Sequence, residues 1–198
     1  LQTNLRWTAE GSDLRNDLLI FMISYATDRA YRGVGDMPPL GIRMMASLEL
    51  ALSAGELRLS STDADEQPFL DYRYFQREED LRRMREAVRL CVSLGEHERF
   101  NDIIESRIEP TDEELTSDED LNAYMVREVT TGQHISGTCK MGPDSDDMAV
   151  VNQYGRVRGI GNLRIVDASI MPDCIRANTN VTTMMIAERV SDFIKDDK

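Results

Sequence analysis

The beginning of the chain alternates between apolar and polar positions as β-strands do. Residues 4–8 alternate, and residues 17–25 form an apolar run rich in strand-forming side chains. Residues 31–41 hold three glycines and two prolines, a composition typical of a loop. The first forty residues are therefore expected to form two strands followed by a loop.

The next stretch predicts a β-hairpin. Residues 48–52 and 56–59 alternate on either side of the turn-like sequence Ser53-Ala54-Gly55. A polar turn over residues 60–68 and an extended segment over residues 69–75 follow. We expect these strands to pair in an antiparallel sheet.

Helical spacing replaces alternation at residue 78. The segment 78–95 begins with three acidic residues, which favour a helix N-terminus, and Gly95 is a plausible stop. Its expected core face carries four apolar side chains: Leu81, Met84, Val88 and Cys91. A second helix is predicted over residues 117–129, with a capping box formed by Thr116 and Glu119. The acidic residues 111–120 lack the ligand alternation of a calcium loop and are interpreted as a solvated face.

The last third has a different pattern. Residues 131–143 are rich in Gly, Thr and Ser and are expected to be irregular. Residues 162–167 are expected to form a buried strand that ends at Asp167, and residues 180–195 to form a helix. The fold class predicted is α+β: a mainly antiparallel sheet with packed helices, followed by a C-terminal strand–helix segment. The expected domain boundary divides residues 1–130 from residues 131–198.

Composition narrows the range of functions. The 198 residues are 41% hydrophobic and 30% charged, typical of a globular domain, and the net charge is −13. Such an acidic surface disfavours binding to nucleic acids and anionic lipids, and no apolar run approaches the ~20 residues of a membrane span. The three cysteines lie far apart, which favours reduced thiols and a cytoplasmic location. The two histidines lack a zinc-ligand pattern, so no metal is expected.

Two polar stretches are candidates for chemistry. His134 lies in the sequence His-Ile-Ser-Gly-Thr-Cys-Lys-Met-Gly, where a core role for a histidine is poorly supported. Asn178-Thr179-Asn180 precedes the last helix, and the ordinary role of such an Asn is to cap the helix. Together with Asp167, these residues have the chemistry of a site that handles developing negative charge.

These stretches carry a family resemblance. Residues 134–142, 162–172 and 178–182 resemble, in order and separation, the C-terminal signature of the glucose–methanol–choline (GMC) flavoprotein oxidoreductases. Residues 53–95 are similar to that family's substrate-binding portion. The resemblance implies FAD as cofactor and oxidation of an alcohol to an aldehyde by hydride transfer to flavin.

The resemblance also implies roles for single residues. His134 would accept the hydroxyl proton, and Asn178 would be the second catalytic residue; choline-oxidising members have Asn at this position. Asp167 and Ala168 would lie near the pyrophosphate and ribityl chain of FAD, and Thr179 and Asn180 near the flavin ring. Cys139 is expected to be neither a nucleophile nor a metal ligand.

The sequence departs from the family in one respect. The family's G-x-G-x-x-G turn, which binds the ADP part of FAD, is absent, and Gly33-Val34-Gly35 does not replace it. The chain also begins without Met, so we expect it to be part of a longer protein whose N-terminal FAD-binding half is its partner. Two other functions are consistent with the same residues: a hydroxynitrile-type lyase that uses His134 without redox change, and a non-catalytic substrate-domain module.

Overall fold

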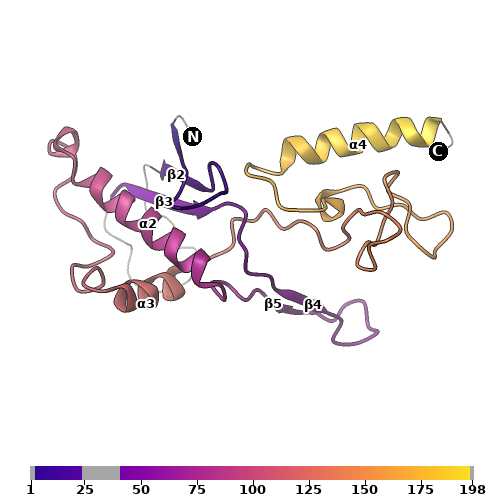
Figure 1. Cartoon of the computed structure of the whole chain (residues 1–198), viewed down its shortest axis with the longest axis horizontal. Coiled ribbons are helices and arrows are strands. Elements are labelled where there is room, and N and C mark those ends of the chain that lie inside the picture. Colours follow the sequence, from indigo (N-terminus) through magenta and orange to yellow (C-terminus); the bar gives the residue numbers. More distant parts are fainter. Residues whose placement is uncertain (1–2, 24–40, 197–198) are drawn as a thin grey trace. The chain divides into compact units, whose positions relative to one another are not determined.

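The computed structural model describes residues 3–23 and 41–196 (Figure 1). The chain divides into two compact units, Leu1–Thr130 and Thr131–Lys198. Among its described residues, the first unit has two antiparallel sheets and two α-helices, and those of the second have one long α-helix and much irregular backbone. The loop predicted at residues 31–41 lies outside the described residues except for Gly41.

A three-stranded antiparallel sheet opens the first unit. Its strands are β1 (Asn4–Trp7), β2 (Leu18–Ile23) and β3 (Arg43–Leu48), in the order β1-β2-β3. The central strand is the most buried, because Leu18, Leu19 and Ile20 are almost completely covered. The strands predicted near residues 4–8 and 17–25 are thus confirmed over the described part of each segment.

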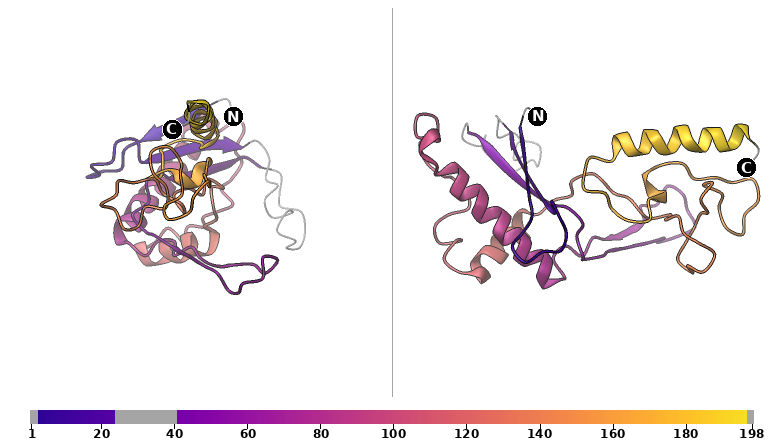
Figure 2. Two further views of the ribbon diagram at one scale, coloured as in Figure 1. Left: turned by 90° about the vertical axis from the view of Figure 1, so that its right-hand side faces the viewer. Right: turned by 45° about the horizontal axis from the view of Figure 1, so that its top comes forward.

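Helix α2 (Glu78–Gly95) packs against this sheet, with the bounds that the sequence predicts (Figure 2). Ala87 joins Ala9 and Leu18 in the small hydrophobic core, with Met84 packed against it. The predicted core face is partly wrong, because Leu81, Met84, Val88 and Cys91 are only half-buried. The most buried residues of α2 are Asp80, Arg83, Arg85 and Ala87.

A buried ion network explains why charged side chains of α2, and not the predicted apolar ones, are its most buried residues. The Arg83 guanidinium donates to Asp17 Oδ2 at 3.2 Å and to Asp80 Oδ1 at 2.6 Å, and all three side chains are at most 1% exposed. Arg83 also donates to the carbonyl oxygens of Glu49 and Leu50. The network therefore joins the start of β2, the backbone after β3 and the first turn of α2.

The hairpin predicted over residues 48–59 is wrong. Leu48 ends β3, and strand β4 (Glu56–Arg58) pairs instead with β5 (Phe69–Asp71) in a separate two-stranded sheet. Leu50 has a φ of 54°, which is incompatible with a strand, and Asp80 accepts the backbone N–H groups of Leu52 and Ser53. The expected strand is thus held as a loop at the N-terminus of α2.

The β4–β5 hairpin carries exposed leucines on one face and extends away from the three-stranded sheet of its own unit (Figure 1). Leu57 lies opposite Leu70, so their side chains share one face, and period-two alternation places Leu59 on the same side. These side chains are 52%, 40% and 82% exposed. The described residues thus leave the apolar face of this hairpin largely uncovered.

A short 3₁₀ helix, η1 (Glu98–Phe100), and helix α3 (Asp118–Glu128) complete the first unit. The second predicted helix is confirmed, but its capping residue is Ser117, whose hydroxyl accepts the N–H of Asp120 at 3.1 Å. The capping box predicted at Thr116 and Glu119 is therefore shifted by one residue. Leu121 and Met125 are the buried residues of α3, which packs against α2.

The second unit folds around helix α4 (Asn180–Lys195), whose predicted bounds are confirmed. Its core contains Val151, Ile170, Met171 and Val190, and Ile170 belongs to a 3₁₀ helix, η2 (Ala168–Ile170). Val181, Met184, Met185 and Ile194 of α4 are more than half exposed. Within the two described segments of the chain, no helix is both long and apolar enough to span a lipid bilayer.

The strand predicted over residues 162–167 is wrong. Asn162 has a φ of 62°, and only Arg164 forms a bridge, an isolated antiparallel one with Arg156. The N–H of Ile165 donates to the carbonyl oxygen of Gly155. A Cβ added to Gly155 would lie only 2.9 Å from the carbonyl oxygen of Ile165. Residues 162–167 thus form an irregular segment that lies close to the backbone near Gly155, and not a strand of a larger sheet.

Candidate active site

The loop that carries His134 is fixed to the residues around η2 by its backbone. The N–H groups of Gly137, Cys139 and Met141 donate to the carbonyl oxygens of Ala168, Ser169 and Ile170 at 3.3, 2.9 and 2.8 Å. Because Ile170 is buried in the core of the unit, these bonds tie the loop to that core. Gly137 has a φ of 81°, a value that favours glycine and turns the chain between His134 and this ladder.

His134 is held at both ring nitrogens by the two residues before α4. Asn178 Nδ2 lies 3.0 Å from His134 Nε2, and Thr179 Oγ1 lies 3.3 Å from His134 Nδ1. The histidine and the asparagine are exposed side chains. The structure thus brings the two expected catalytic residues into direct contact.

This pair has the chemistry of a base next to an oxygen-binding group. An amide nitrogen only donates hydrogen bonds, so Nε2 of His134 accepts from Asn178 and carries its lone pair there. A neutral imidazole is suited to accept a proton near pH 7. The amide N–H can hold an oxygen on which negative charge develops without competing for that proton.

Asp167 and Ala168 lie beside the histidine loop. Ala168 accepts the N–H of Gly137 through its carbonyl oxygen. Asp167 caps η2, and its Oδ1 accepts the N–H and the hydroxyl of Ser169 at 2.8 and 2.5 Å. Sequence reasoning missed this role of Ser169, although an Asp followed two residues later by Ser is a spacing typical of such side-chain turns.

Asn180 begins α4 and is exposed, next to the His134 contacts. Thr179 occupies the N-cap position but makes no capping bond through its side chain, and the first turn contains no acidic residue. The positive end of the helix dipole is therefore not compensated by a carboxylate from α4 itself. Such a helix end suits a ligand with developing negative charge.

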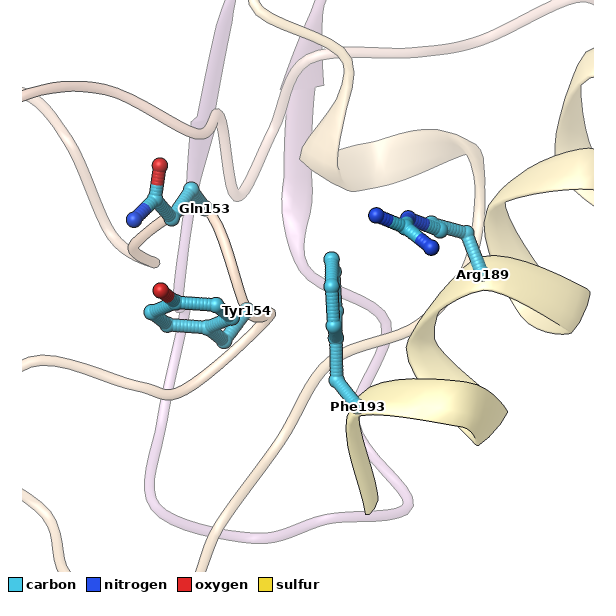
Figure 3. Close-up of a pocket in the computed structure, with 4 residues that line it drawn as sticks. All are labelled: Gln153, Tyr154, Arg189 and Phe193. Carbon is cyan, nitrogen blue, oxygen red and sulfur yellow. The ribbon is translucent and has the colours of Figure 1, made fainter. Parts of the chain in front are cut away.

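A shallow pocket of about 290 Å³ lies at the opposite end of α4 (Figure 3). Phe193 stands between Tyr154, which meets its ring edge-on at 5.0 Å, and the Arg189 guanidinium, 4.5 Å from its centroid. Thirteen helical residues separate Asn180 from Phe193, a distance of roughly 20 Å. This cluster packs a loop against α4 and is separate from the His134 site.

The metal-ligating and thiol side chains of the described residues form no cluster that could bind a metal ion. Among residues 3–23 and 41–196, no group of three or more His, Cys, Asp or Glu side chains could hold a metal ion. All three cysteines are free thiols, and burial raises the pKa of Cys91 to about 11. The contact that holds Cys139 in the loop is made by its backbone N–H.

Comparison with known proteins identifies close sequence relatives. An oxygen-dependent choline dehydrogenase of Proteus mirabilis (strain HI4320) is 38% identical over 143 residues, which are 72% of this chain and 25% of the relative. One of Pectobacterium carotovorum subsp. carotovorum (strain PC1) is 36% identical over 165 residues, 83% of this chain and 29% of the relative. The chain therefore spans little more than a quarter of the length of these curated relatives.

Solved structures have the same fold. A formate oxidase of Aspergillus oryzae RIB40, described in terms of FAD modification, matches 92% of this chain and 32% of its own with a TM-score of 0.81 and 25% identity. Pyridoxine 4-oxidase from Mesorbium loti matches 96% of this chain and 36% of its own with a TM-score of 0.82; at 22% identity this match shows the fold alone.

The family model described as GMC oxidoreductase matches residues 51–187. This match covers most of the chain, including the His134 loop, η2 and the start of α4. The resemblance inferred from the sequence motifs is thus confirmed. The chain belongs to the GMC oxidoreductase family.

Proposed function

We propose that this chain is the C-terminal part of an FAD-dependent oxidoreductase that converts an alcohol to an aldehyde. The observation that carries the proposal is the contact between His134 and Asn178, two residues distant in sequence. In this proposal residues 1–130 belong to the substrate-binding domain. Residues 131–198 contribute the catalytic histidine and the cofactor contacts.

His134 is the general base of the proposed reaction. An alcohol whose hydroxyl displaces the Asn178 amide from Nε2 donates its proton to the nitrogen lone pair that the amide occupies in the free chain. As the proton leaves, negative charge develops on the substrate oxygen. The Asn178 N–H then donates to that oxygen, which lowers the energy of the transition state more than that of the bound alcohol.

Bound FAD would supply the acceptor for the hydride that leaves the substrate carbon. The residues at the start of α4 suit this cofactor, because the uncompensated helix N-terminus favours the negative charge that the flavin ring gains on reduction. Thr179 and Asn180 would lie at the flavin ring through this helix end. Asp167 and Ala168, next to the anchored loop, would contact the ribityl and pyrophosphate region.

The proposed partner is the nucleotide-binding remainder of a longer polypeptide. Two-stranded hairpins are marginally stable alone in water, and the apolar face of β4–β5 is exposed in this chain. The apolar side chains of α4 are also exposed. Relatives of which the matched residues are only 25% and 29% have enough additional sequence to cover both surfaces.

Anaerobic mixing of the longer, FAD-loaded polypeptide with alcohols tests the proposal. Choline is the first alcohol to test, because the relatives are named choline dehydrogenases and the residue beside His134 is Asn178. Loss of the oxidised flavin absorbance together with aldehyde formation supports the proposal. Cyanohydrin cleavage with unchanged flavin absorbance would instead identify a lyase, and inactivity toward both classes would favour a non-catalytic module.

A further inference from the structure

We propose that Ser169 is a positioning residue for His134. In this assignment the Ser169 side chain locks the short helix η2 to Asp167, and the backbone of η2 holds the loop that carries the histidine. The effect on the reaction rests on the proposed function. The coupling between Ser169 and the histidine loop is a property of the fold, and it can be measured without turnover.

Two hydrogen bonds from Ser169 converge on one oxygen of Asp167. Oδ1 of Asp167 accepts the backbone N–H of Ser169 at 2.8 Å and its hydroxyl at 2.5 Å. An ionised carboxylate has no proton to give, so the serine hydroxyl has to be the donor. Hydrogen bonds to a charged acceptor are shorter and stronger than those between neutral groups. The hydroxyl of Ser169 therefore strengthens a turn that its N–H alone would close more weakly.

Helix η2 depends on this side-chain contact because its own backbone bonds are long. It is a single 3₁₀ turn, a conformation with poor hydrogen-bond geometry. The N–H of Ile170 donates to the carbonyl oxygen of Asp167 at 3.3 Å, and that of Met171 to the carbonyl oxygen of Ala168 at 3.2 Å. Burial of Ile170 and Met171 holds the end of this turn. Its exposed start is held by the shorter bonds between Asp167 and Ser169.

The three carbonyl oxygens of η2 each accept an N–H of the histidine loop. The central one belongs to Ser169 and accepts the N–H of Cys139 at 2.9 Å. Gly137, whose N–H donates to Ala168, lies only three residues after His134. A change in the backbone of η2 therefore moves all three acceptors of the loop together.

His134 depends on this backbone support because packing does little to hold it. Its side chain is exposed, and its ring contacts Asn178 and Thr179 just before α4. In the proposed reaction the substrate displaces Asn178 from Nε2, which removes one of these contacts. A displacement of about 1 Å at a reacting group can slow a reaction by roughly 100-fold. Ser169 thus acts on the base through the backbone of the loop.

Hydrogen exchange of the longer, FAD-loaded polypeptide, followed by mass spectrometry that resolves single amides, measures the coupling of Ser169 to the loop. The test variant is Ser169→Ala, and Ser169→Thr restores a hydroxyl. The amides of Gly137, Cys139 and Met141 should exchange roughly 10-fold faster in Ser169→Ala, which loses a hydrogen bond to a charged group. In Ser169→Thr they should keep the wild-type rate. Ser145→Ala removes an exposed hydroxyl of the same unit and should leave these amides unchanged, and the amides of α2 are the reference within each protein.

Anaerobic stopped-flow mixing of the same proteins with alcohol gives the second readout. In Ser169→Ala the limiting rate of flavin reduction should fall by roughly 10-fold, since the base is less often in position. The dissociation constants for alcohol and for FAD should stay close to those of the wild type, because Ser169 holds neither ligand in this assignment. Ser169→Thr should restore the rate. A merely structural role would lower FAD content or the urea midpoint without this selective change in the limiting rate.

Unchanged exchange of the loop amides in Ser169→Ala would overturn the proposal, and so would faster exchange without a fall in the limiting rate. If Ser169→Ala does not fold, Asp167→Asn takes its place. Its amide oxygen still accepts both bonds but lacks the charge, so the loop should exchange faster than in the wild type, and a wild-type rate would contradict the proposal. If no alcohol reduces the flavin of the unmodified polypeptide, the proposed function fails, and the exchange result alone decides whether Ser169 holds the histidine loop.

Discussion

Asn178 Nδ2 lies 3.0 Å from Nε2 of His134, although 44 residues separate them in the chain. Two local features produce this contact: the backbone ladder from the histidine loop to η2, and the start of α4. A proton acceptor and a hydrogen-bond donor thus meet where one substrate oxygen could contact both. The predictions below follow from this pair and from the packing that supports it.

Asn178→Ala should slow reduction of the flavin by alcohol in the FAD-loaded polypeptide by roughly 10- to 150-fold. The variant removes one donor to the developing negative charge but leaves the base in place, and a hydrogen bond to a charged group contributes about 1.5–3 kcal/mol. Stopped-flow absorbance measures the rate. A loss larger than that of His134→Ala would mean that the amide, and not the imidazole, has the leading role.

Cys139→Ser should leave most of the activity intact. Cys139 is held in the loop by its backbone N–H, which donates to the carbonyl oxygen of Ser169, and serine preserves that bond. The same rate assay, with metal analysis of the purified chain, checks this expectation. Inactivity of a folded Cys139→Ser protein, or one metal ion bound per chain, would show that the thiol has a chemical role.

Asp80→Asn should destabilise the first unit by about 3–5 kcal/mol, since it leaves a buried guanidinium without a full countercharge. Asp80 accepts bonds from Leu52, Ser53 and Arg83. Urea unfolding at pH 7 measures the change. The control is Glu79→Gln on the same turn: Glu79 pairs with Arg82 in a partly exposed salt bridge, so the unfolding midpoint should stay close to that of the wild type.

The same network predicts a dependence of stability on acid. Burial by itself would raise the pKa of Asp80 and of Asp17, but hydrogen bonds to each carboxylate outweigh it, and both pKa values are lowered. Because the folded pKa lies below the ordinary value of 3.8, the stabilisation is complete above that pH. It is lost as the pH falls through 3.8 toward the lowered folded value. Urea midpoints that stay constant from pH 6 to pH 3 would contradict this assignment.

The isolated 198-residue chain should bind FAD weakly. The start of α4, Asp167 and Ala168 offer few hydrogen bonds, each contributing about 0.5–1.5 kcal/mol, against the entropy lost by a long flexible ligand. The net charge of −13 gives no attraction to a pyrophosphate. Calorimetric titration should therefore detect no sub-micromolar binding. Tight binding would mean that this chain already contains most of the cofactor site.

The helices could be predicted from the sequence because their signals are local. The periodic apolar positions of α2 and α4 and their terminal residues determine both pairs of bounds. The core face of α2 could not be predicted, because Asp80 and Arg83 are buried by partners far away in sequence, Asp17 among them. Apolar spacing cannot reveal a buried ion network whose members lie 66 residues apart.

The strand predictions failed where tertiary contacts override alternation. Residues 48–52 alternate, yet the Asp80 carboxylate binds the N–H groups of Leu52 and Ser53 and Leu50 adopts a positive φ. The pairing of β4 with β5 across a polar loop depends on register, which alternation alone does not specify. The family motifs implied that His134 and Asn178 belong to one active site, but the sequence did not predict their direct contact or the hydroxyl of Thr179 on the same ring.

The central claim is that His134 accepts the substrate proton, and stopped-flow reduction of the FAD-loaded polypeptide by alcohol tests it most directly. His134→Ala should lower the rate of flavin reduction by roughly 10²- to 10⁴-fold, the usual contribution of a positioned general base. His97→Ala, which changes the chain's other histidine, should leave the rate unchanged. An unchanged rate in a folded, FAD-loaded His134→Ala protein would remove His134 from the mechanism and contradict the account.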